Sequence, residues 1–388
     1  DRRQLVLRLA QSLGLAWIIL AGIFYLIPQM MIGRGVLLLA FPFSLLLMVV
    51  WRVSIHWLLG HPKFGERILI IGSGETAIDV ARQVLQRPDV GYRIAGFADN
   101  RPELVGKSLI NPQVLGTMAD LQTLITKHKI DRVITAMNER RGQFPVKQLL
   151  DLSLSGNVAI EECTSFYERL TGRVNLDLLR PSWLIFSSRG RQARISAFLR
   201  VLMHRGVAVI GAILSLPIAL LTALLIRLES RGPIFYRQER VGKNGQPFEV
   251  LKFRSMQVDA EKDGPVWATN GDDRVTRVGR VIRKTRIDEI PQFWNIIKGE
   301  MSFVGPRPER PHFVAQLAEE IEFYKQRHLI APGLTGWAQI KYPYGASVED
   351  ARRKLEYDLY YIKNQGLALD AVIIFETIKT ILFGRGAR

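Results

Sequence analysis

Two long apolar stretches lie near the start of the chain, at residues 13–30 and 36–59. Each has about 18 or more residues and almost no charge in its middle, the length that an α-helix needs to cross a membrane. Only Arg34 is charged in the loop between them, whereas basic residues precede the first stretch and follow the second. Because Lys and Arg are enriched on the cytoplasmic side, the pattern predicts a transmembrane helical hairpin over residues 1–62, within a larger bundle. Two buried helices of a soluble domain are the alternative.

A third apolar stretch, Gly206 to Ile226, is interrupted near its midpoint by Pro217. It is long enough to span a membrane, but arginines precede and follow it, so both ends favour the cytoplasmic side. Pro217 removes one helix hydrogen bond and forces a bend. The pattern predicts a kinked, re-entrant helix over residues 201–227 that enters and leaves on the same face of the membrane. A straight third crossing is the alternative.

Residues 63–190 alternate apolar strands with helices, which indicates a Rossmann-like parallel-sheet domain. The apolar run at 68–73 is typical of a strand covered on both faces. It leads into a Gly72-x-Gly74 turn, where the first glycine permits the turn and the second lets a phosphate approach the next helix. A second strand ends at Asp99, within the range where an acidic side chain meets a ribose hydroxyl.

This possible nucleotide loop, Gly72, Gly74 and Asp99, is a weak signal by itself. No Tyr-x-x-x-Lys or comparable redox pair follows it within the domain. The sequence therefore favours a structural domain without a bound cofactor, and a nicotinamide or another nucleotide is the alternative.

The charge of the whole chain narrows the class of partner. The formal net charge is +17 and the sequence pI is about 10.1, yet 48% of the residues are hydrophobic. This combination suits a protein that lies against anionic lipid or holds phosphorylated substrates. Nucleic acid is not expected as a partner, because the chain lacks an aromatic stacking platform or a reading helix. The single cysteine, Cys163, excludes an intrachain disulfide framework.

Residues suited to chemistry are concentrated between Arg231 and Gln339. This part has no Ser/His/Asp set, no HxxH or CxxC motif and no Walker loop. Its segments are, in order, GPIFYRQERVG (232–242), LKFRSM (251–256), DAE (259–261), IRKTRIDEIPQFWN (282–295), GEMSFVGPRPE (299–309) and PGLTGWAQ (332–339).

An adjacent acidic pair, Asp288 and Glu289, stands just before a proline, where a helix is expected to run to about Lys298. A helix cap would explain one acid. It does not explain the neighbouring Arg283 and Arg286, which with Lys284 are expected to hold both carboxylates ionised. Paired acids among arginines suit phosphoryl transfer, since arginines neutralise phosphate, one carboxylate can bind Mg²⁺ and the other can attack phosphorus.

Further cations lie in the neighbouring segments. Arg307 stands between two prolines, so its guanidinium can be aimed with little loss of entropy. A structural turn is the alternative. Lys252 and Arg254 alternate along an expected strand and would share one face. They are candidate phosphate ligands or a solvated edge.

Residues 191–388 resemble the bacterial sugar transferases, the monotopic polyprenyl-phosphate phosphoglycosyl transferases that prime exopolysaccharide and O-antigen synthesis. The resemblance rests on GPIFYRQERVG, KFRSM, DEIPQFWN, GEMSFVGPRPE and PGLTGWAQ in this order. Residues 1–190 resemble the front of the long form of that family. The tail, with YPYGASVEDA, resembles its exosortase-associated branch.

The resemblance implies a mostly helical α+β catalytic domain and a two-step reaction. Asp288 would attack the β-phosphate of a UDP-sugar, release UMP and carry the phosphosugar, which then passes to undecaprenyl phosphate. Asp288 and Glu289 would hold Mg²⁺, while Arg283 and Arg307 match arginines that hold phosphates. It also implies the inner membrane, an active site on the cytoplasmic face, and a possible homodimer.

Two departures concern the membrane helix and the donor loop. The re-entrant helix usually opens with Lys-Arg followed by Asp, but here His204-Arg205 has no following acid. Lys341-Tyr342 stands where short-form enzymes carry an arginine after TGWAQ. The rival functions are an oxidoreductase or nucleotide-sugar-modifying enzyme that uses the glycine turn, and a non-catalytic scaffold for polysaccharide assembly.

Overall fold

The computed structural model divides into two compact units, Asp1–Phe166 and Tyr167–Arg388. The division falls inside helix α6 (Cys163–Thr171), before the boundary at residue 190 expected from the sequence. The structure describes residues 13–14, 16–17, 20–22, 24–25, 28–30, 33–60, 65–87, 90–136, 146–154, 156, 158–179, 194–258, 260, 273–342, 345 and 347–383.

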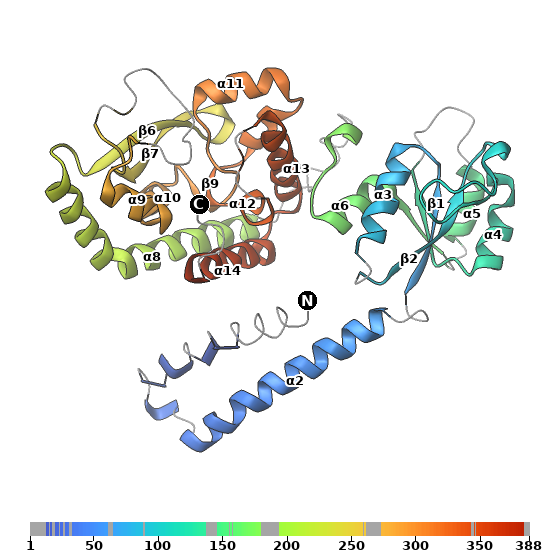
Figure 1. Ribbon diagram of the computed structural model, residues 1–388, viewed down its shortest axis with the longest axis horizontal. Helices are drawn as coiled ribbons and strands as arrows, with labels where there is room; N and C mark the ends of the chain where they lie inside the picture. The colour runs from blue at the N-terminus through green and yellow to red at the C-terminus, as the bar shows by residue number, and fades with distance from the viewer. Residues whose placement is uncertain are drawn as a thin grey trace. The chain divides into compact units, whose positions relative to one another are not determined.

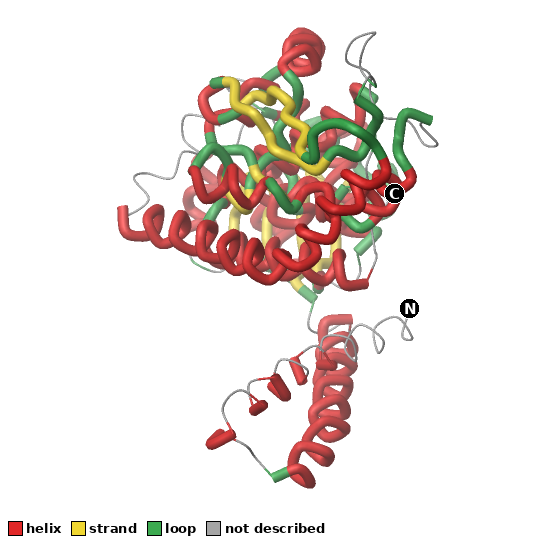
Figure 2. Tube along the Cα trace, turned by 90° about the vertical axis from the view of Figure 1, so that its left-hand side faces the viewer, coloured by secondary structure: helices red, strands yellow, loops and turns green. Residues whose placement is uncertain are grey.

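The first unit begins with a short 3-10 turn, η1 (Pro28–Met30), and a long apolar helix, α2 (Arg34–Gly60). Figure 2 shows α2 as one uninterrupted helix despite the proline at position 42. It covers the second apolar stretch of the expected membrane hairpin, while residues 15, 18, 19, 23, 26 and 27 of the first stretch lie outside the described residues. The hairpin therefore stays a prediction.

The rest of the first unit is a five-stranded parallel sheet in the order β3-β2-β1-β4-β5, with α3, α4 and α5 around it (Figure 1). This order is that of a Rossmann-like fold, as predicted. Its elements are β1 (Glu66–Ile71), α3 (Glu75–Leu85), β2 (Tyr92–Ala98), η3 (Pro102–Leu104), β3 (Val114–Gly116), η4 (Met118–Asp120), α4 (Leu121–His128), β4 (Arg132–Thr135), α5 (Val146–Leu154) and β5 (Ala159–Glu162).

The sheet forms because its central strand can be buried on both faces. Ile68, Leu69, Ile70 and Ile71 of β1 have no exposed surface. At about 25 cal/mol per Å² of apolar surface, such burial is the main favourable term for a strand without alternation. Cys163 is also buried, and burial raises the pKa of its thiol to about 12, so it is an unreactive core residue.

The second unit packs short strands among helices, the mixed α+β arrangement expected for the catalytic domain (Figure 1). β6 and β7 form an antiparallel hairpin, and β8 pairs in parallel with β9. Its elements are η5 (Leu176–Leu178), α8 (Arg194–Glu229), β6 (Phe235–Val241), η6 (Lys243–Gly245), β7 (Pro247–Phe253), α9 (Arg277–Lys284), η7 (Ile287–Glu289), α10 (Gln292–Lys298), β8 (Ser302–Val304), α11 (Pro311–Glu320), η8 (Tyr324–Leu329), β9 (Gly333–Thr335), α12 (Trp337–Lys341), α13 (Val348–Asn364) and α14 (Leu367–Phe383).

Helix α8 contains the third apolar stretch, and among the described residues it alone is long and apolar enough to cross a membrane. It stays helical through Pro217, and Figure 1 shows the ribbon bending along its course. Ser215 Oγ donates to the carbonyl of Ala212 at 3.3 Å, next to the carbonyl that Pro217 leaves without a donor. The proline therefore bends the helix without breaking it.

Both ends of α8 are attached to the same catalytic unit. Ile226, near its C-terminal end, packs with Phe253 and Ile282, and Glu229 accepts a hydrogen bond from the N–H of Arg277 at 2.7 Å. Between the attached ends, many apolar side chains are exposed, for example Leu214 at 74%. One face of the helix stays packed on the unit, at Ala208 and Ala219 for example, while other faces expose apolar side chains.

The N-terminal part of α8 is held through the buried carboxylate of Asp370 on α14 (Figure 1). Asp370 Oδ2 accepts from Arg200 Nε at 2.7 Å and contacts His204 Nε2 at 3.1 Å, while Oδ1 accepts from Tyr361 at 2.7 Å. No acidic residue follows His204-Arg205 in the sequence of α8. In the fold, Asp370 of α14 supplies a carboxylate to this part of the helix.

Asp370→Asn is expected to lower the free energy of unfolding by about 3–5 kcal/mol, because the buried Arg200 guanidinium loses its charged partner. Urea or thermal unfolding in detergent measures the change. Glu376→Gln on the same helix is the control, since its pair with Lys379 is partly exposed, within one helix turn, and contributes at most about 1 kcal/mol. Equal stability of the two variants would contradict this role of Asp370.

Candidate active site

The acidic pair lies on the tight turn η7 between α9 and α10. The single helix expected from Asp288 to Lys298 is instead divided into η7 and α10 at Pro291, which cannot donate a backbone hydrogen bond. Arg286, with a left-handed φ of 59°, separates η7 from α9. α10 begins at Gln292. Non-glycine residues in this conformation are uncommon and store strain. The turn places adjacent carboxylates on a rigid base.

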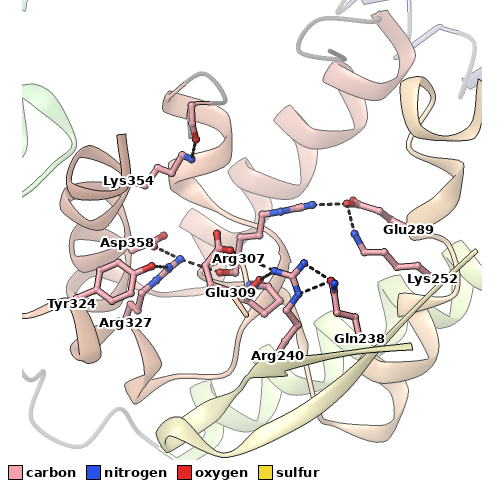
Figure 3. A network of polar contacts seen from close by, with 12 residues as sticks. Gln238, Arg240, Lys252, Glu289, Arg307, Glu309, Tyr324, Arg327, Lys354 and Asp358 are labelled. Atoms are coloured by element: carbon pink, nitrogen blue, oxygen red, sulfur yellow. Dashed lines mark hydrogen bonds and ion pairs between the residues drawn. The ribbon is translucent and has the colours of Figure 1, made fainter. Parts of the chain in front are cut away.

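Three cations gather at one oxygen of Glu289, and Figure 3 shows two of them, Arg307 and Lys252. Oε1 lies 2.7 Å from Arg307, 3.6 Å from Lys252 and 3.7 Å from Arg286. Burial opposes ionisation of Glu289, but these charges outweigh it and lower the pKa of its carboxyl to about 2. Glu289 is therefore ionised at neutral pH, and Arg307, which is distant in sequence, is its nearest partner.

Asp288 has the opposite electrostatics. Its side chain is buried, and no side chain or backbone group in the described parts donates a hydrogen bond to it. Burial raises the pKa of Asp288, the charge of Glu289 adds to this rise, and Lys252, Arg307 and Arg286 only partly offset it. The neighbouring cations thus outweigh desolvation in the pKa of Glu289, whereas desolvation outweighs them in the pKa of Asp288.

Lys252 enters the site from the last part of β7. Asn295 of α10 fixes this strand, because its side chain accepts from the N–H of Leu251 at 3.0 Å and donates to the carbonyl of Glu249 at 2.7 Å. Burial lowers the pKa of Lys252 although Glu289 opposes the shift. The lysine thus contributes a poorly hydrated charge beside the carboxylates.

Arg307 comes from the loop between β8 and α11. Gly305 lies so close to the next strand that a Cβ there would be 2.5 Å from the carbonyl oxygen of Ala331. The flanking prolines restrict the backbone further. Arg307 and Arg286 keep 31% and 41% of their side-chain surface exposed, so part of the positive charge is open to an approaching phosphate.

Two predicted phosphate ligands are not brought to the carboxylates. Arg283 lies on α9 and, among the described residues, pairs with neither acid, so its phosphate-binding role stays a prediction. Arg254 lies just beyond the end of β7 and donates to the carbonyl of Ser230 at 2.9 Å and to that of Arg231 at 3.1 Å. The described contacts of Arg254 thus hold the backbone after α8, and its phosphate-binding role stays a prediction.

Arg254→Met is expected to lower the free energy of unfolding by about 1–3 kcal/mol, because buried carbonyls lose their donor. The same change should leave kcat within about fivefold of wild type, since no reacting group is removed. Arg307→Met, which removes a cation from Glu289, is the comparison. A large loss of kcat with unchanged stability would place Arg254 in the active site.

The glycine turn of the middle domain lies at the ends of β1 and β2, as predicted. Gly72 has a φ of 104°, and Gly74 directly precedes α3. Asp99 accepts from the Nε of Arg101 at 3.0 Å and from the hydroxyl of Ser73. The acidic group expected to meet a ribose is thus already paired within the protein.

The two carboxylates suit a magnesium ion. Asp288 receives no hydrogen bond from the described residues, and all three cations approach Glu289 at Oε1 rather than Oε2. Mg²⁺ binds through one or two carboxylates together with substrate phosphates and water. The described residues contain no cluster of three or more acidic, His or Cys ligands, so such an ion would depend on substrate oxygens.

Sequence reasoning missed Arg240, Arg327 and Asp358, which lie behind Arg307 (Figure 3). Arg327 and Asp358 form a buried ion pair at 2.9 Å, although they are far apart in sequence. Arg240 stands within the segment GPIFYRQERVG, but the order of residues there does not mark it apart from the other charged residues of the segment.

Comparison with known proteins places these features in a family. Residues 195–384 match the family described as bacterial sugar transferase, and residues 1–160 match the CoA-binding domain family. The chain is 51% identical over 221 residues to the UDP-N-acetylgalactosamine-undecaprenyl-phosphate N-acetylgalactosaminephosphotransferase of Aeromonas hydrophila, covering 57% of this chain and 52% of that protein.

Two further relatives match over most of the chain. The undecaprenyl-phosphate glucose phosphotransferase of Komagataeibacter xylinus is 34% identical over 84% of this chain and 60% of its own length. The UDP-glucose:undecaprenyl-phosphate glucose-1-phosphate transferase of Klebsiella pneumoniae is 33% identical over 81% and 67%. The chain thus spans between about half and two thirds of these relatives.

Proposed function

Because the chain belongs to the bacterial sugar transferase family, we propose that it transfers a sugar 1-phosphate from a UDP-sugar to undecaprenyl phosphate. The observation that carries this proposal is the buried pair of Asp288 and Glu289 beside Arg307, Lys252 and Arg286. Such a site can neutralise a diphosphate and presents a carboxylate without a protein partner.

In the first step, a carboxylate oxygen of Asp288 attacks the β-phosphorus of the donor. The bond from that phosphorus to the bridging oxygen breaks, and UMP leaves with this oxygen. Asp288 then carries the sugar phosphate as an acyl phosphate. In the second step, a phosphate oxygen of the lipid attacks the same phosphorus and releases the Asp288 carboxylate. The product is an undecaprenyl diphosphate sugar.

The surrounding residues have separate roles in this scheme. Arg307, Lys252 and Arg286 fix Glu289 and neutralise donor phosphate oxygens. Asp288 and Glu289 would hold Mg²⁺, which would supply further neutralisation of the diphosphate charge. Because burial disfavours an ionised Asp288, the positive charge of a bound Mg²⁺ would favour the reactive carboxylate.

The attachment of both ends of α8 to one unit supports a re-entrant membrane helix. A bent helix whose two ends are held by the same unit enters and leaves the membrane on one face, which keeps the site on that side. In this proposal the protein lies in the inner membrane with its site facing cytoplasmic UDP-sugars, and it initiates exopolysaccharide or O-antigen synthesis. A homodimer is compatible with this placement.

The test incubates the detergent-purified chain with undecaprenyl phosphate, Mg²⁺ and a panel of donors that includes UDP-glucose and UDP-N-acetylgalactosamine. UMP release that depends on a particular donor, with formation of the lipid product, is the expected result. Absence of UMP with every UDP-sugar, under conditions where the protein remains folded, would contradict the proposed function.

A further inference from the structure

The loop that carries Arg307 is held by two buried arginines from different elements (Figure 3). Arg240 of β6 donates to the carbonyl of Pro308 at 3.0 Å. Arg327 of η8 donates to the carbonyl of Arg307 itself at 2.9 Å. Successive carbonyls of the loop are thus fixed by charged donors, which form stronger hydrogen bonds than neutral ones.

Arg240 is itself fixed by neighbouring acceptors. Its Nη2 and Nε donate to Gln238 Oε1 at 2.6 and 3.1 Å, and Nη1 lies 3.4 Å from Glu309. The N–H of Val241 also donates to the carbonyl of Glu309 at 2.9 Å. With 18% of its side chain exposed, Arg240 joins β6 rigidly to the end of the loop.

Arg327 is held more deeply. Its side chain is 7% exposed, it donates to the hydroxyl of Tyr324 at 2.7 Å, and it pairs with Asp358 of α13 at 2.9 Å. The guanidinium has a fixed orientation, because Tyr324, Asp358 and the carbonyl of Arg307 all contact it.

These contacts carry an electrostatic cost. Burial lowers the pKa of Arg240, and the charge of Arg307 lowers it further although Glu309 opposes the shift. Placing like charges behind Arg307 is unfavourable, and a neutral donor could satisfy one carbonyl. The rigid, planar guanidinium instead fixes the backbone in several directions at once.

We propose that Arg240 and Arg327 are positioning residues for Arg307. They hold its backbone so that its guanidinium reaches Glu289 at 2.7 Å and meets the donor diphosphate in the same orientation. This inference rests on the proposed transfer reaction. A displacement of about 1 Å in such a group can cost on the order of 100-fold in rate.

The test is a double-mutant cycle in the full chain, measured as kcat and KM for UMP release. Arg240→Met is expected to lower kcat by about 10- to 100-fold with a smaller change in the KM of the donor. In an Arg307→Lys background the same change should cost less than about threefold, because the group that it positions is already altered. Arg240→Lys, which keeps a donor for Pro308, should recover part of the loss.

Arg237→Gln on the same strand is the matched control, because its pair with Glu249 is exposed. For the second arginine, Arg327→Met is combined with Asp358→Leu so that no buried carboxylate remains unpaired. Circular dichroism checks that every variant is folded.

The outcomes separate the two proposals. Wild-type protein that releases no UMP contradicts the proposed function and, with it, this inference. If the wild type is active but folded Arg240→Met keeps full kcat, or loses as much in the Arg307→Lys background as alone, the positioning role is wrong and the proposed function stands.

Discussion

Asp288→Asn is expected to lower kcat on the order of 10⁴-fold and to raise the melting temperature. The loss of activity follows because an amide cannot form the acyl phosphate, and removal of a covalent nucleophile is among the most costly changes in an enzyme. The gain in stability follows from the raised pKa of the buried Asp288, since the charge that is unfavourable in the folded state disappears.

The stability change caused by Asp288→Asn should depend on pH in a defined direction. A carboxyl whose pKa is raised by folding stabilises the protein fully below its unfolded value of 3.8, and this contribution is lost as pH rises through the folded-state pKa. The melting temperatures of Asp288→Asn and wild type should therefore differ more at pH 7 than at pH 4, without divalent cations.

Asp350→Asn is the control, because its melting temperature should change in the opposite direction to that of Asp288→Asn. Hydrogen bonds from Ser347 lower the pKa of Asp350, so its replacement should reduce the melting temperature. An Asp288→Asn variant that keeps more than about a tenth of wild-type kcat would show that another group is the nucleophile.

Glu289→Gln is expected to lower the free energy of unfolding by about 3 kcal/mol and kcat by about 100- to 1,000-fold. The carboxylate offsets the charges of Arg307, Lys252 and Arg286, and its removal leaves these cations close together with one partner missing. The same cations then lose the orientation that they need to meet a phosphate.

The stability of Glu289 also depends on pH in a defined direction. Because its folded-state pKa is about 2, below the ordinary 4.5, its contribution is present above pH 4.5 and is lost as pH falls towards 2. Chemical unfolding at pH 7 and at pH 3 should show a smaller difference between wild type and variant at the lower pH. Glu249→Gln, in an exposed pair on β7, should change stability by less than about 1 kcal/mol. If Glu289→Gln behaves like this control, the ion cluster does not organise the site.

Continuous hydrophobic patterns gave the most reliable predictions of secondary structure. The apolar run of β1 predicted a strand buried on both faces, and the stretch around Pro217 predicted a long bent helix. These inferences succeed because burial and helix hydrogen bonding depend on neighbouring residues. The division between the two units falls inside α6, because residues such as Glu168 and Arg173 of the second unit pair with residues of α13 that are distant in sequence.

The site was predictable in part. The acidic pair and the proline-bounded Arg307 are local motifs, but the burial that raises the pKa of Asp288 comes from packing of separate elements. Lys252 contacts Glu289 whereas Arg254 contacts the carbonyls of Ser230 and Arg231, a difference in partners that depends on the fold and not on strand alternation. Arg327 and Asp358 meet only through the fold, so no sequence periodicity marks them.

Mass spectrometry of the peptide that contains Asp288 tests directly whether this residue carries the sugar phosphate during the reaction. Purified chain is mixed with Mg²⁺ and its UDP-sugar without the lipid acceptor, quenched in acid and digested. If Asp288 is the nucleophile, this peptide gains the mass of one sugar phosphate, and addition of undecaprenyl phosphate removes it. The Asp288→Asn variant never acquires the added mass. An active wild type whose Asp288 remains unmodified, or whose sugar phosphate is found on another residue, would contradict the role of Asp288 as nucleophile.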